Sequence, residues 1–357
     1  MRKRILPILV LFAFLFAETK AQTTVTVNNT PGSAATYRTL QGALDSAAAG
    51  SVILLQPGLA TYGQVTVKKL VSIFGAGYFP NQNPAPFTQA NSAESVVDYI
   101  NFDAGSNGSM ISGITLNSDA QPYPNQRINI NNSSNITITR CFIGRQGGGT
   151  FISSKGASDI IFRQCYFFHS SGNNFTLSVN TSNNFQFYNC IFDGVGDNLG
   201  TSTDNTSTAV LFKNCTFKNY AGSVVNAIQN VTYINNVIFN TTTPGNLFSC
   251  AAASNNVGNV TYTSGSGNNI TNAVPENTLV FATDPNIISR DGKLALKAGS
   301  PAIGYGQDGK DAGAYGGAEP YILSGIPIIP NIYLAETVGA ATQSGNLKIR
   351  IKAKANQ

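Results

Sequence analysis

The chain has 357 residues, of which 42% are hydrophobic and 11% are charged. This apolar content excludes a largely disordered chain, because it suffices to build a core. The formal net charge is +5, but after the first residues the only basic run is "KIRIKAK" near the C-terminus. We therefore expect no nucleic-acid partner, since such binders carry an extended basic patch.

The first 21 residues predict a secretory signal peptide. Three basic residues, 2–4, precede an apolar run, residues 5–17, and Ala21 stands before Gln22. The run is shorter than the ~20 apolar residues of a spanning helix, which disfavours a membrane anchor, and no later segment is long and apolar enough to span. Cleavage near Ala21 and Gln22 leaves 18 basic and 16 acidic residues, a net charge of +2. The mature protein is expected to be secreted or at the cell surface.

After the signal peptide the sequence predicts one short helix and then strands. The stretch "YRTLQGALDSAAAG" has apolar residues at helical spacing and ends in Gly50, a residue type common at helix C-termini. The segments "SVILLQPG", "QVTVKKL" and "VSIFGAG" follow and read as strands. The apolar positions of the helix are Leu40, Ala43, Leu44 and Ala47.

The middle of the chain repeats one pattern: apolar, any, apolar, two residues, cysteine or aliphatic, any, apolar. Its sixth position, which we call the cysteine column, recurs every 22–27 residues, a period typical of solenoids. Leucine-rich repeats have a similar length, but their leucine consensus does not appear. The column is predicted to contain Ile114, Cys141, Cys165, Cys190, Cys215 and Val237.

The spacing within each repeat predicts strands joined by a bend. Apolar residues alternate with period 2 on both sides of the two residues that precede the column, so those two residues must turn the chain. Asn189, Asn214 and Asn236 occupy the second of these positions, and Asn tolerates a left-handed backbone. Stacked rungs of such strands form parallel sheets. The predicted fold is an all-β parallel β-helix spanning residues 22–320, with the helix capping its N-terminal end.

The cysteines are predicted to be core residues. Side chains of one column stack ~4.8 Å apart, where free Cys behaves as a small hydrophobe. Secretion would permit disulfides, but stacked side chains point in parallel, so closing a bond would distort the backbone. We expect free, buried thiols. Cys250 lies outside the column and has no assigned partner.

The last segment, residues 321–357, predicts a β-hairpin. The stretches "NIYLAETV" and "NLKIRIKAKA" alternate and flank "GAATQSG". This hairpin is expected to cap the C-terminal end of the solenoid or to form a small appendage.

Two segments resemble a known fold family. The stretch "YRTLQGALDSAAAGSVILLQPGLATYGQVTV" resembles the opening of right-handed β-helix proteins with the pectin-lyase-like fold. The stretch "LALKAGSPAIGYGQDGKDAGAYGG" is similar to the closing segment of many secreted bacterial β-helix proteins. The resemblance implies a right-handed coil over most of the mature chain. It does not imply one activity, because the fold hosts lyases, hydrolases, esterases and adhesins.

The resemblance also suggests where an active site would be sought. Polysaccharide lyases of this fold usually use an Arg or Lys base, commonly with Ca²⁺ held by clustered carboxylates. Asp193, Asp197 and Asp204 are the candidate Ca²⁺ ligands, although Asp among Gly and Asn is also common in ordinary turns. The candidate acid–base residues are His169, Arg145, Asp193 and Lys218. A position at a solvent-exposed loop edge would explain these polar residues equally well.

The outward positions suggest a binding surface. Residues one after and two before the column are forced outward, so rung stacking aligns them in ladders. Exposed aromatic rings beside cations suit sugar rings and their acidic substituents. The alternative is that loops fold over these ladders and bury them. The candidate ligand-binding residues are Arg163, Tyr166, Tyr188 and Lys213.

The leading interpretation is a secreted or surface-associated, monomeric β-helix protein that binds extracellular polysaccharide without an established catalytic centre. One alternative is a polysaccharide lyase or glycoside hydrolase acting on acidic polysaccharide, with Ca²⁺ as a possible cofactor. Another is a structural or adhesive surface protein. The sequence does not name the ligand.

Overall fold

The computed structural model describes residues 22–117, 126–145, 150–169, 177–194, 209–220, 230–240, 247–248, 250–264, 267–271, 288–338 and 347–355. The predicted signal peptide lies outside the described residues. Within these ranges, no helix has the length and hydropathy needed to cross a bilayer.

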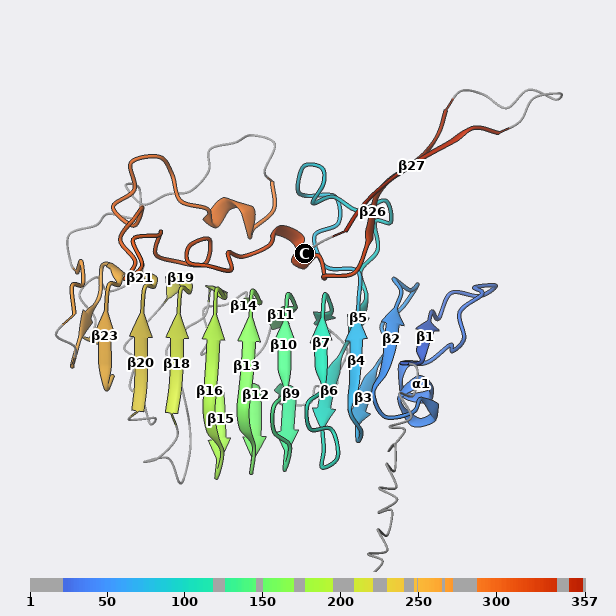
Figure 1. The fold of residues 1–357 in the computed structure, drawn as a ribbon, viewed down its shortest axis with the longest axis horizontal. Helices are drawn as coiled ribbons and strands as arrows, with labels where there is room; N and C mark the ends of the chain where they lie inside the picture. Colours follow the sequence, from blue (N-terminus) through green and yellow to red (C-terminus); the bar gives the residue numbers. More distant parts are fainter. Residues whose placement is uncertain are drawn as a thin grey trace, which may run out of the picture.

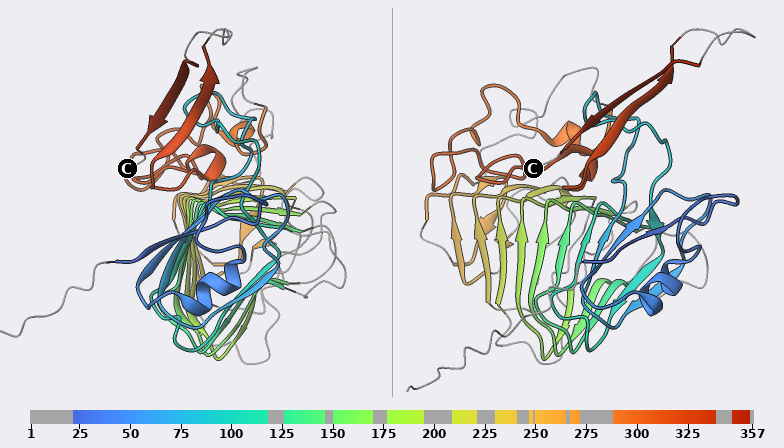
Figure 2. Two further views of the ribbon diagram at one scale, coloured as in Figure 1. Left: turned by 90° about the vertical axis from the view of Figure 1, so that its right-hand side faces the viewer. Right: turned by 45° about the vertical axis from the view of Figure 1, so that its right-hand side comes forward.

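Three parallel sheets wind into a β-helix, which confirms the predicted fold (Figures 1 and 2). In spatial order, sheet A consists of β1 (Thr24–Val27), β2 (Ser51–Leu55), β4 (Val71–Phe74), β7 (Met110–Ser112), β10 (Thr137–Thr139), β13 (Ser158–Arg163), β16 (Asn183–Tyr188), β18 (Ala209–Lys213), β20 (Asn230–Ile234) and β23 (Ala252–Ser254). Sheet B consists of β3 (Gln64–Val67), β6 (Tyr99–Phe102), β9 (Gln126–Asn131), β12 (Thr150–Lys155) and β15 (Leu177–Asn180). Sheet C consists of β5 (Val96–Val97), β8 (Thr115–Leu116), β11 (Phe142–Arg145), β14 (Tyr166–His169), β17 (Ile191–Asp193), β19 (Thr216–Tyr220), β21 (Val237–Asn240) and β24 (Val257–Gly258). A short parallel pair, β22 (Leu247–Phe248) and β25 (Thr261–Tyr262), lies near the end of the solenoid.

The predicted capping helix is α1, Leu40–Ser46. Thr39 caps it by accepting a hydrogen bond from the backbone N–H of Gly42 at 3.2 Å. Leu40, Ala43 and Leu44 are buried against the first rungs. Gly50 does not end the helix directly, because it lies in the turn before β2 with a φ of 84°.

The core is a set of stacked side-chain columns. On sheet A, the rings of Phe162, Phe187 and Phe212 stack with centroids 4.9 and 4.7 Å apart. Cys141, Cys165, Cys190 and Cys215 are buried free thiols, as predicted, and Cys250 is also free and buried. The stacked rings bury large apolar surfaces at the spacing that parallel strands impose.

The cysteine column continues into a ladder of buried asparagines, which corrects its predicted end. Thr216 pairs with Val237, so Asn236 is the partner of Cys215 and Val237 comes one residue later. Asn236 donates from Nδ2 to the carbonyl of Phe212 at 3.0 Å and accepts from the N–H of Cys215 at 2.7 Å. Asn256 and Asn269 extend the same ladder.

Cysteine and asparagine occupy equivalent positions in the hydrogen bonding of this column. The Sγ of Cys165 lies 3.4 Å from the carbonyl of Ile138, three residues before the column in the preceding rung. Cys190 and Cys215 repeat this contact with the equivalent carbonyls at 3.6 and 3.4 Å. The column position therefore accommodates small side chains that can donate a hydrogen bond to this carbonyl. The cysteine thiol is a weaker donor than the asparagine amide.

Each bend from sheet A to sheet C passes through a left-handed residue directly before the column. The φ value is 67° at Gly113 and lies between 52° and 56° at the six later positions. The predicted left-handed bend is therefore confirmed for Asn189 and Asn214 and is wrong for Asn236. We call the six later residues, all of which have a side chain, the bend residues: Arg140, Gln164, Asn189, Asn214, Asn235 and Asn255.

The bend residues hold a long segment, residues 288–330, that we call the strap. The strap includes the 3₁₀ turns Gly292–Leu294 and Leu323–Gly325. Asn189 donates to the carbonyls of Ala314 and Gly316 at 2.8 and 2.7 Å. Gln164 donates to the carbonyl of Pro320 at 2.6 Å, and Arg140 to that of Ile326 at 2.9 Å. Residues 305–330 of the strap therefore run along the solenoid axis from its C-terminal end towards its N-terminal end, whereas the strap begins beside the loop after β4, where Ile288 and Ser289 donate to the carbonyl of Gln82 (Figure 1).

The strap covers the outward face of sheet C. Beneath it lies a second apolar cluster, separate from the solenoid interior, to which sheet C contributes Phe142, Tyr166 and Ile191. Leu294 and Tyr321 of the strap pack into this cluster. An outward sheet face is thereby converted into core.

A buried carboxylate anchors the strap to the loop that follows β4. Asp291 is fully buried and accepts hydrogen bonds from the N–H groups of Gly292 and Ser324 at 2.9 and 2.8 Å. Asn83 donates to it at 3.4 Å, and the hydroxyls of Tyr78 and Tyr321 hydrogen bond to each other nearby. Burial raises the pKa of Asp291 above its usual range, although these hydrogen bonds oppose the shift.

The predicted hairpin is present as the antiparallel pair β26 (Asn331–Thr337) and β27 (Ile349–Lys354). It projects away from the solenoid beyond the strap (Figure 2). The backbone N–H of Ala90 donates to the carbonyl of Ile332 at 3.0 Å, which ties the base of the hairpin to the loop after β4.

We expect Asn236→Val to destabilise the protein by about 2–4 kcal/mol, because the buried N–H of Cys215 and the carbonyl of Phe212 lose their partner. Cys190→Val loses only weak thiol contacts and should cost less than about 1.5 kcal/mol. Urea denaturation of both variants measures the difference. Equal costs would contradict the hydrogen-bonding role of the column.

We expect the free energy of unfolding of the wild type to fall, relative to that of Asp291→Asn, as pH rises from about 4 to 7. The raised pKa means that the folded state holds this proton more tightly than the unfolded chain, whose Asp has a pKa of about 3.9. The resulting stabilisation is complete below that value and is lost as pH rises through the folded pKa. Denaturation at both pH values tests this, and a constant difference would contradict it.

Candidate functional site

Three of the four predicted binding residues lie side by side on the outward face of sheet A. Arg163, Tyr188 and Lys213 are register neighbours on β13, β16 and β18, and we call them the sheet A ladder. The guanidinium carbon of Arg163 lies 4.7 Å from the centroid of the Tyr188 ring, a cation–π contact. All three side chains are partly exposed. The ladder therefore presents cation, ring and cation on successive strands.

Polar side chains hydrogen bond to two members of this ladder, Arg163 and Tyr188. Glu319 of the strap forms an ion pair with Arg163 at 2.9 Å, and the two side chains are 66% and 37% exposed. The hydroxyl of Tyr188 donates to Gln186 at 2.7 Å, and Gln186 donates to Asn184 at 2.7 Å. Exposed ion pairs are weak, so Glu319 positions Arg163 without fixing it permanently.

Tyr166 does not belong to this surface, and the prediction that it is exposed is wrong. It points outward from sheet C as its register requires, but the strap covers it and it is fully buried. Its ring stacks on Phe142 with centroids 5.7 Å apart, and its hydroxyl donates to Asp193 Oδ2 at 2.7 Å. The alternative of a covered ladder is therefore correct for this row.

Two of the acid–base candidates, His169 and Asp193, lie on opposite faces of sheet C. Arg145 pairs in register with His169, and Asp193 pairs with Lys218. The His169 ring is buried inside the solenoid, 6.1 Å from the ring of Phe151, whereas Asp193 contacts Tyr166 on the outward face. Since successive strand residues face opposite sides, the sheet directs His169 and Asp193 apart. Core packing accounts for His169, and a catalytic role for these residues stays a prediction.

The predicted Ca²⁺ site cannot be placed, because Asp197 and Asp204 lie outside the described residues. Its third candidate, Asp193, accepts the Tyr166 hydrogen bond. In the part of the chain that the structure describes, no three His, Cys, Asp or Glu side chains gather as a metal site requires.

Sequence reasoning missed the contribution of the strap to both surfaces. Glu319 reaches the sheet A ladder, and the guanidinium carbon of Arg290 lies 4.2 Å from the ring centroid of Phe168 on sheet C. Their spacing from the repeats, more than a hundred residues, carries no periodic signal. The polar bend residues were the available signal, because buried amides need partners.

Comparison with known proteins shows likeness in fold alone. No family model and no curated protein matches the chain. Pectate lyase Pel9A is 14% identical, with 83% of this chain and 96% of that chain covered and a TM-score of 0.46. A mannuronic acid specific polysaccharide family 6 lyase from human gut microbiota is 10% identical, covers 70% and 59%, and has a TM-score of 0.43. The pectin methylesterase of Aspergillus niger is 14% identical, covers 76% and 97%, and has a TM-score of 0.39. Such low identities and scores give no basis for transferring an activity.

We expect Tyr166→Ala to lower the free energy of unfolding by about 3–5 kcal/mol, because it leaves a cavity under the strap and removes the hydrogen bond to Asp193. Tyr188→Ala should change it by less than about 1 kcal/mol, since that ring lies on a partly exposed face. Chemical denaturation compares the matched variants. A stable Tyr166→Ala protein would show that the strap does not seal this row.

Proposed function

We propose that the protein binds an acidic extracellular polysaccharide through the sheet A ladder. The observation that supports this is the stacking of Arg163 on Tyr188, with Lys213 on the next strand. The Tyr188 ring and the guanidinium of Arg163 that lies over it offer an apolar surface and a positive charge at one place. Sugar rings that carry carboxylates have the complementary features.

The ion pair with Glu319 suggests how the ligand is recognised. Arg163 already holds one carboxylate oxygen at 2.9 Å, in an exposed pair. A carboxylate on a sugar can take the place of Glu319 and form a bidentate contact with the guanidinium. Lys213 would then contact a further acidic group along the same row.

The direction of the ladder suits a polymer. Its three residues follow one another across adjacent strands, so the row runs along the solenoid axis at ~4.8 Å per strand. An extended chain lying on this row would contact successive strands with successive residues. The predicted signal peptide supports an extracellular ligand.

We expect the Arg163→Ala, Tyr188→Ala double variant to lose retention in affinity electrophoresis through a gel containing polygalacturonate. Its dissociation constant should rise by about tenfold or more, because a charged hydrogen bond and a ring contact are lost. Glu319→Gln should increase retention, since it removes the competing carboxylate. Retention of the wild type should fall with added salt.

Lys155→Ala is the matched charge control, because Lys155 is exposed on β12 of sheet B. It should leave retention unchanged. A double variant that unfolds at the wild-type temperature and is retained as strongly as the wild type would sink the proposal. Unsaturated products or new reducing ends in the same mixtures would identify a lyase or a hydrolase, the alternative function.

A further inference from the structure

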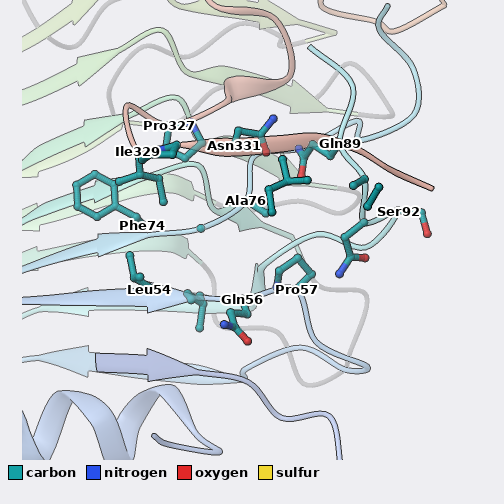
Figure 3. A pocket seen from close by; sticks show the side chains of 17 residues that line it. Leu54, Gln56, Pro57, Phe74, Ala76, Gln89, Ser92, Pro327, Ile329 and Asn331 are labelled. Carbon is teal, nitrogen blue, oxygen red and sulfur yellow. The ribbon is translucent and has the colours of Figure 1, made fainter. Parts of the chain in front are cut away.

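The hairpin formed by β26 and β27 is held to the first rungs of the solenoid at its base. The N–H of Ala90 donates to the carbonyl of Ile332 at 3.0 Å, and Nζ of Lys354 lies 5.4 Å from the ring centroid of Phe87. The chain that enters β26 also lines a cavity of about 690 Å³ together with the loop after β4 and the ends of β2 and β4 (Figure 3). From this base the two strands project away from the solenoid (Figure 2). The base therefore fixes the direction in which the hairpin points.

The far end of the hairpin carries apolar side chains on both faces. Thr337 pairs with Ile349 in the last register pair of the two strands. Beyond it, the N–H of Val338 donates to the carbonyl of Lys348 at 2.9 Å. Since successive residues of a strand face opposite sides, Val338 lies on one face, and Leu347 and Ile349 lie on the other. These three residues, which we call the apolar end, are 42%, 56% and 60% exposed.

Exposed aliphatic side chains are concentrated on this hairpin. Among the described residues, ten large apolar side chains are exposed, and five of them belong to the hairpin: Ile332, Val338, Leu347, Ile349 and Ile351. A cluster of exposed apolar side chains on a protein surface marks a site of interaction. A two-stranded hairpin is also marginally stable by itself, because it has little to pack against. The apolar end therefore calls for an apolar partner.

Cations alternate with the apolar residues along β27. Residues 331–338 and 347–355 contain four cations and one carboxylate, Glu336, which gives a net charge of +3. This carboxylate pairs with Arg350 at 2.8 Å, but exposed ion pairs are weak. All four cations are exposed and lie on one face of the strand, and we call them the basic row: Lys348, Arg350, Lys352 and Lys354. The partner must therefore offer negative charge as well as apolar surface.

Two other occupants satisfy only one of these requirements. A second copy that paired along β27 in the register that unites the apolar faces would also set the two basic rows opposite each other. Like charges directly opposite destabilise a sheet. An acidic polysaccharide offers negative charge, but it has no hydrocarbon interior in which the aliphatic side chains of the apolar end could be removed from water. A bilayer that contains anionic lipids offers both.

We propose that the hairpin docks the protein on an anionic lipid bilayer by inserting its apolar end into the interfacial region. There the aliphatic side chains reach the boundary of the acyl chains, as those of other interfacial segments do. The basic row lies at the level of the headgroups, where anionic lipids attract lysine and arginine. Insertion stops in this region, because the open edges of a two-stranded hairpin would lose their hydrogen bonds to water in the hydrocarbon.

The base of the hairpin and the solenoid stay in water. A strand rises by about 3.3 Å per residue, so Ala353 lies roughly 13 Å behind Ile349. The site is separate from the sheet A ladder, which begins at β13, whereas the base of the hairpin is held at the loop after β4. The two proposals can therefore fail independently.

Flotation with lipid vesicles tests the proposal. The chain from Gln22 is used, because the predicted signal peptide would itself bind lipid. Vesicles of equal parts phosphatidylglycerol and phosphatidylcholine should carry the protein, whereas vesicles of phosphatidylcholine alone should not. The Leu347→Ser, Ile349→Ser double variant should lower the partition coefficient by about tenfold or more, because two aliphatic side chains no longer enter the bilayer. The Lys348→Gln, Lys352→Gln double variant should lower it by about tenfold and weaken its dependence on salt.

Tryptophan fluorescence reports which end of the hairpin inserts, because the chain has no tryptophan of its own. In the phosphatidylglycerol vesicles, the emission of Ile349→Trp should shift to shorter wavelength and be quenched by lipids with brominated acyl chains. Ala353→Trp, near the base, should show neither effect. Equal quenching at both positions would contradict insertion by the apolar end.

Matched control variants carry the same substitutions outside the hairpin. Leu59→Ser and the Lys155→Gln, Lys297→Gln double variant change residues that are also exposed, and they should float like the wild type. The Arg163→Ala, Tyr188→Ala variant should also float like the wild type, so its loss of polysaccharide retention bears on the ladder alone. All variants should keep the unfolding temperature of the solenoid.

Four results would overturn the proposal. The first is a wild type that does not float with the anionic vesicles, and the second is undiminished flotation of Leu347→Ser, Ile349→Ser. The third is a dimer in sedimentation velocity that this variant loses, since a second copy would then cover the apolar end. The fourth is loss of polygalacturonate retention in the Lys348→Gln, Lys352→Gln variant, which would make the basic row a polysaccharide site.

Discussion

The left-handed bend between sheets A and C is the constraint on which the other features of the structure depend. A positive φ turns the chain from sheet A into sheet C within two residues, so that apolar side chains on both sides of the bend face inward. The bend residue itself points out of the solenoid, and its side chain is free to bind another segment. Asn189 and Gln164 use that freedom to bind carbonyl groups of the strap. One backbone conformation, repeated in each rung, thus fixes both the core column and the line along which the strap lies.

The column that follows the bend shows how one position accepts two chemistries. Cys215 and Asn236 are consecutive members of it, and each contacts the carbonyl three residues before the column in the preceding rung. Asparagine also accepts the N–H of the residue below it, so it links rungs twice where cysteine links them weakly. The change from thiol to amide does not follow the size of the neighbouring side chains, because Cys141 stands between the aliphatic Ile138 and Ile143, whereas Asn236 follows the buried ring of Tyr233, which stacks on Phe212.

The sequence was sufficient for the features that repeat locally and insufficient for those that depend on distant segments. Period-2 alternation and the cysteine column predicted the parallel β-helix, the free thiols and the bend, because each rung carries its own signal. The predicted column residue in this rung, Val237, was wrong by one position, because an aliphatic residue was expected where the structure has the polar Asn236. Burial of Tyr166 was not predictable from its rung, because the strap that covers it lies more than a hundred residues later and has no period.

The same bend also decides which outward face remains available. Sheet C loses its face to the strap, whereas the residues directly before the bend, Arg163, Tyr188 and Lys213, stay on sheet A at the margin of the strap. They precede Gln164, Asn189 and Asn214, whose side chains bind the strap. The ladder and the strap therefore run side by side. Glu319 can reach Arg163 because Gln164, the next residue after Arg163, holds the backbone carbonyl of Glu319. A ligand on the ladder would lie parallel to the strap and would compete with one of its side chains, so binding and strap docking share an edge of the molecule.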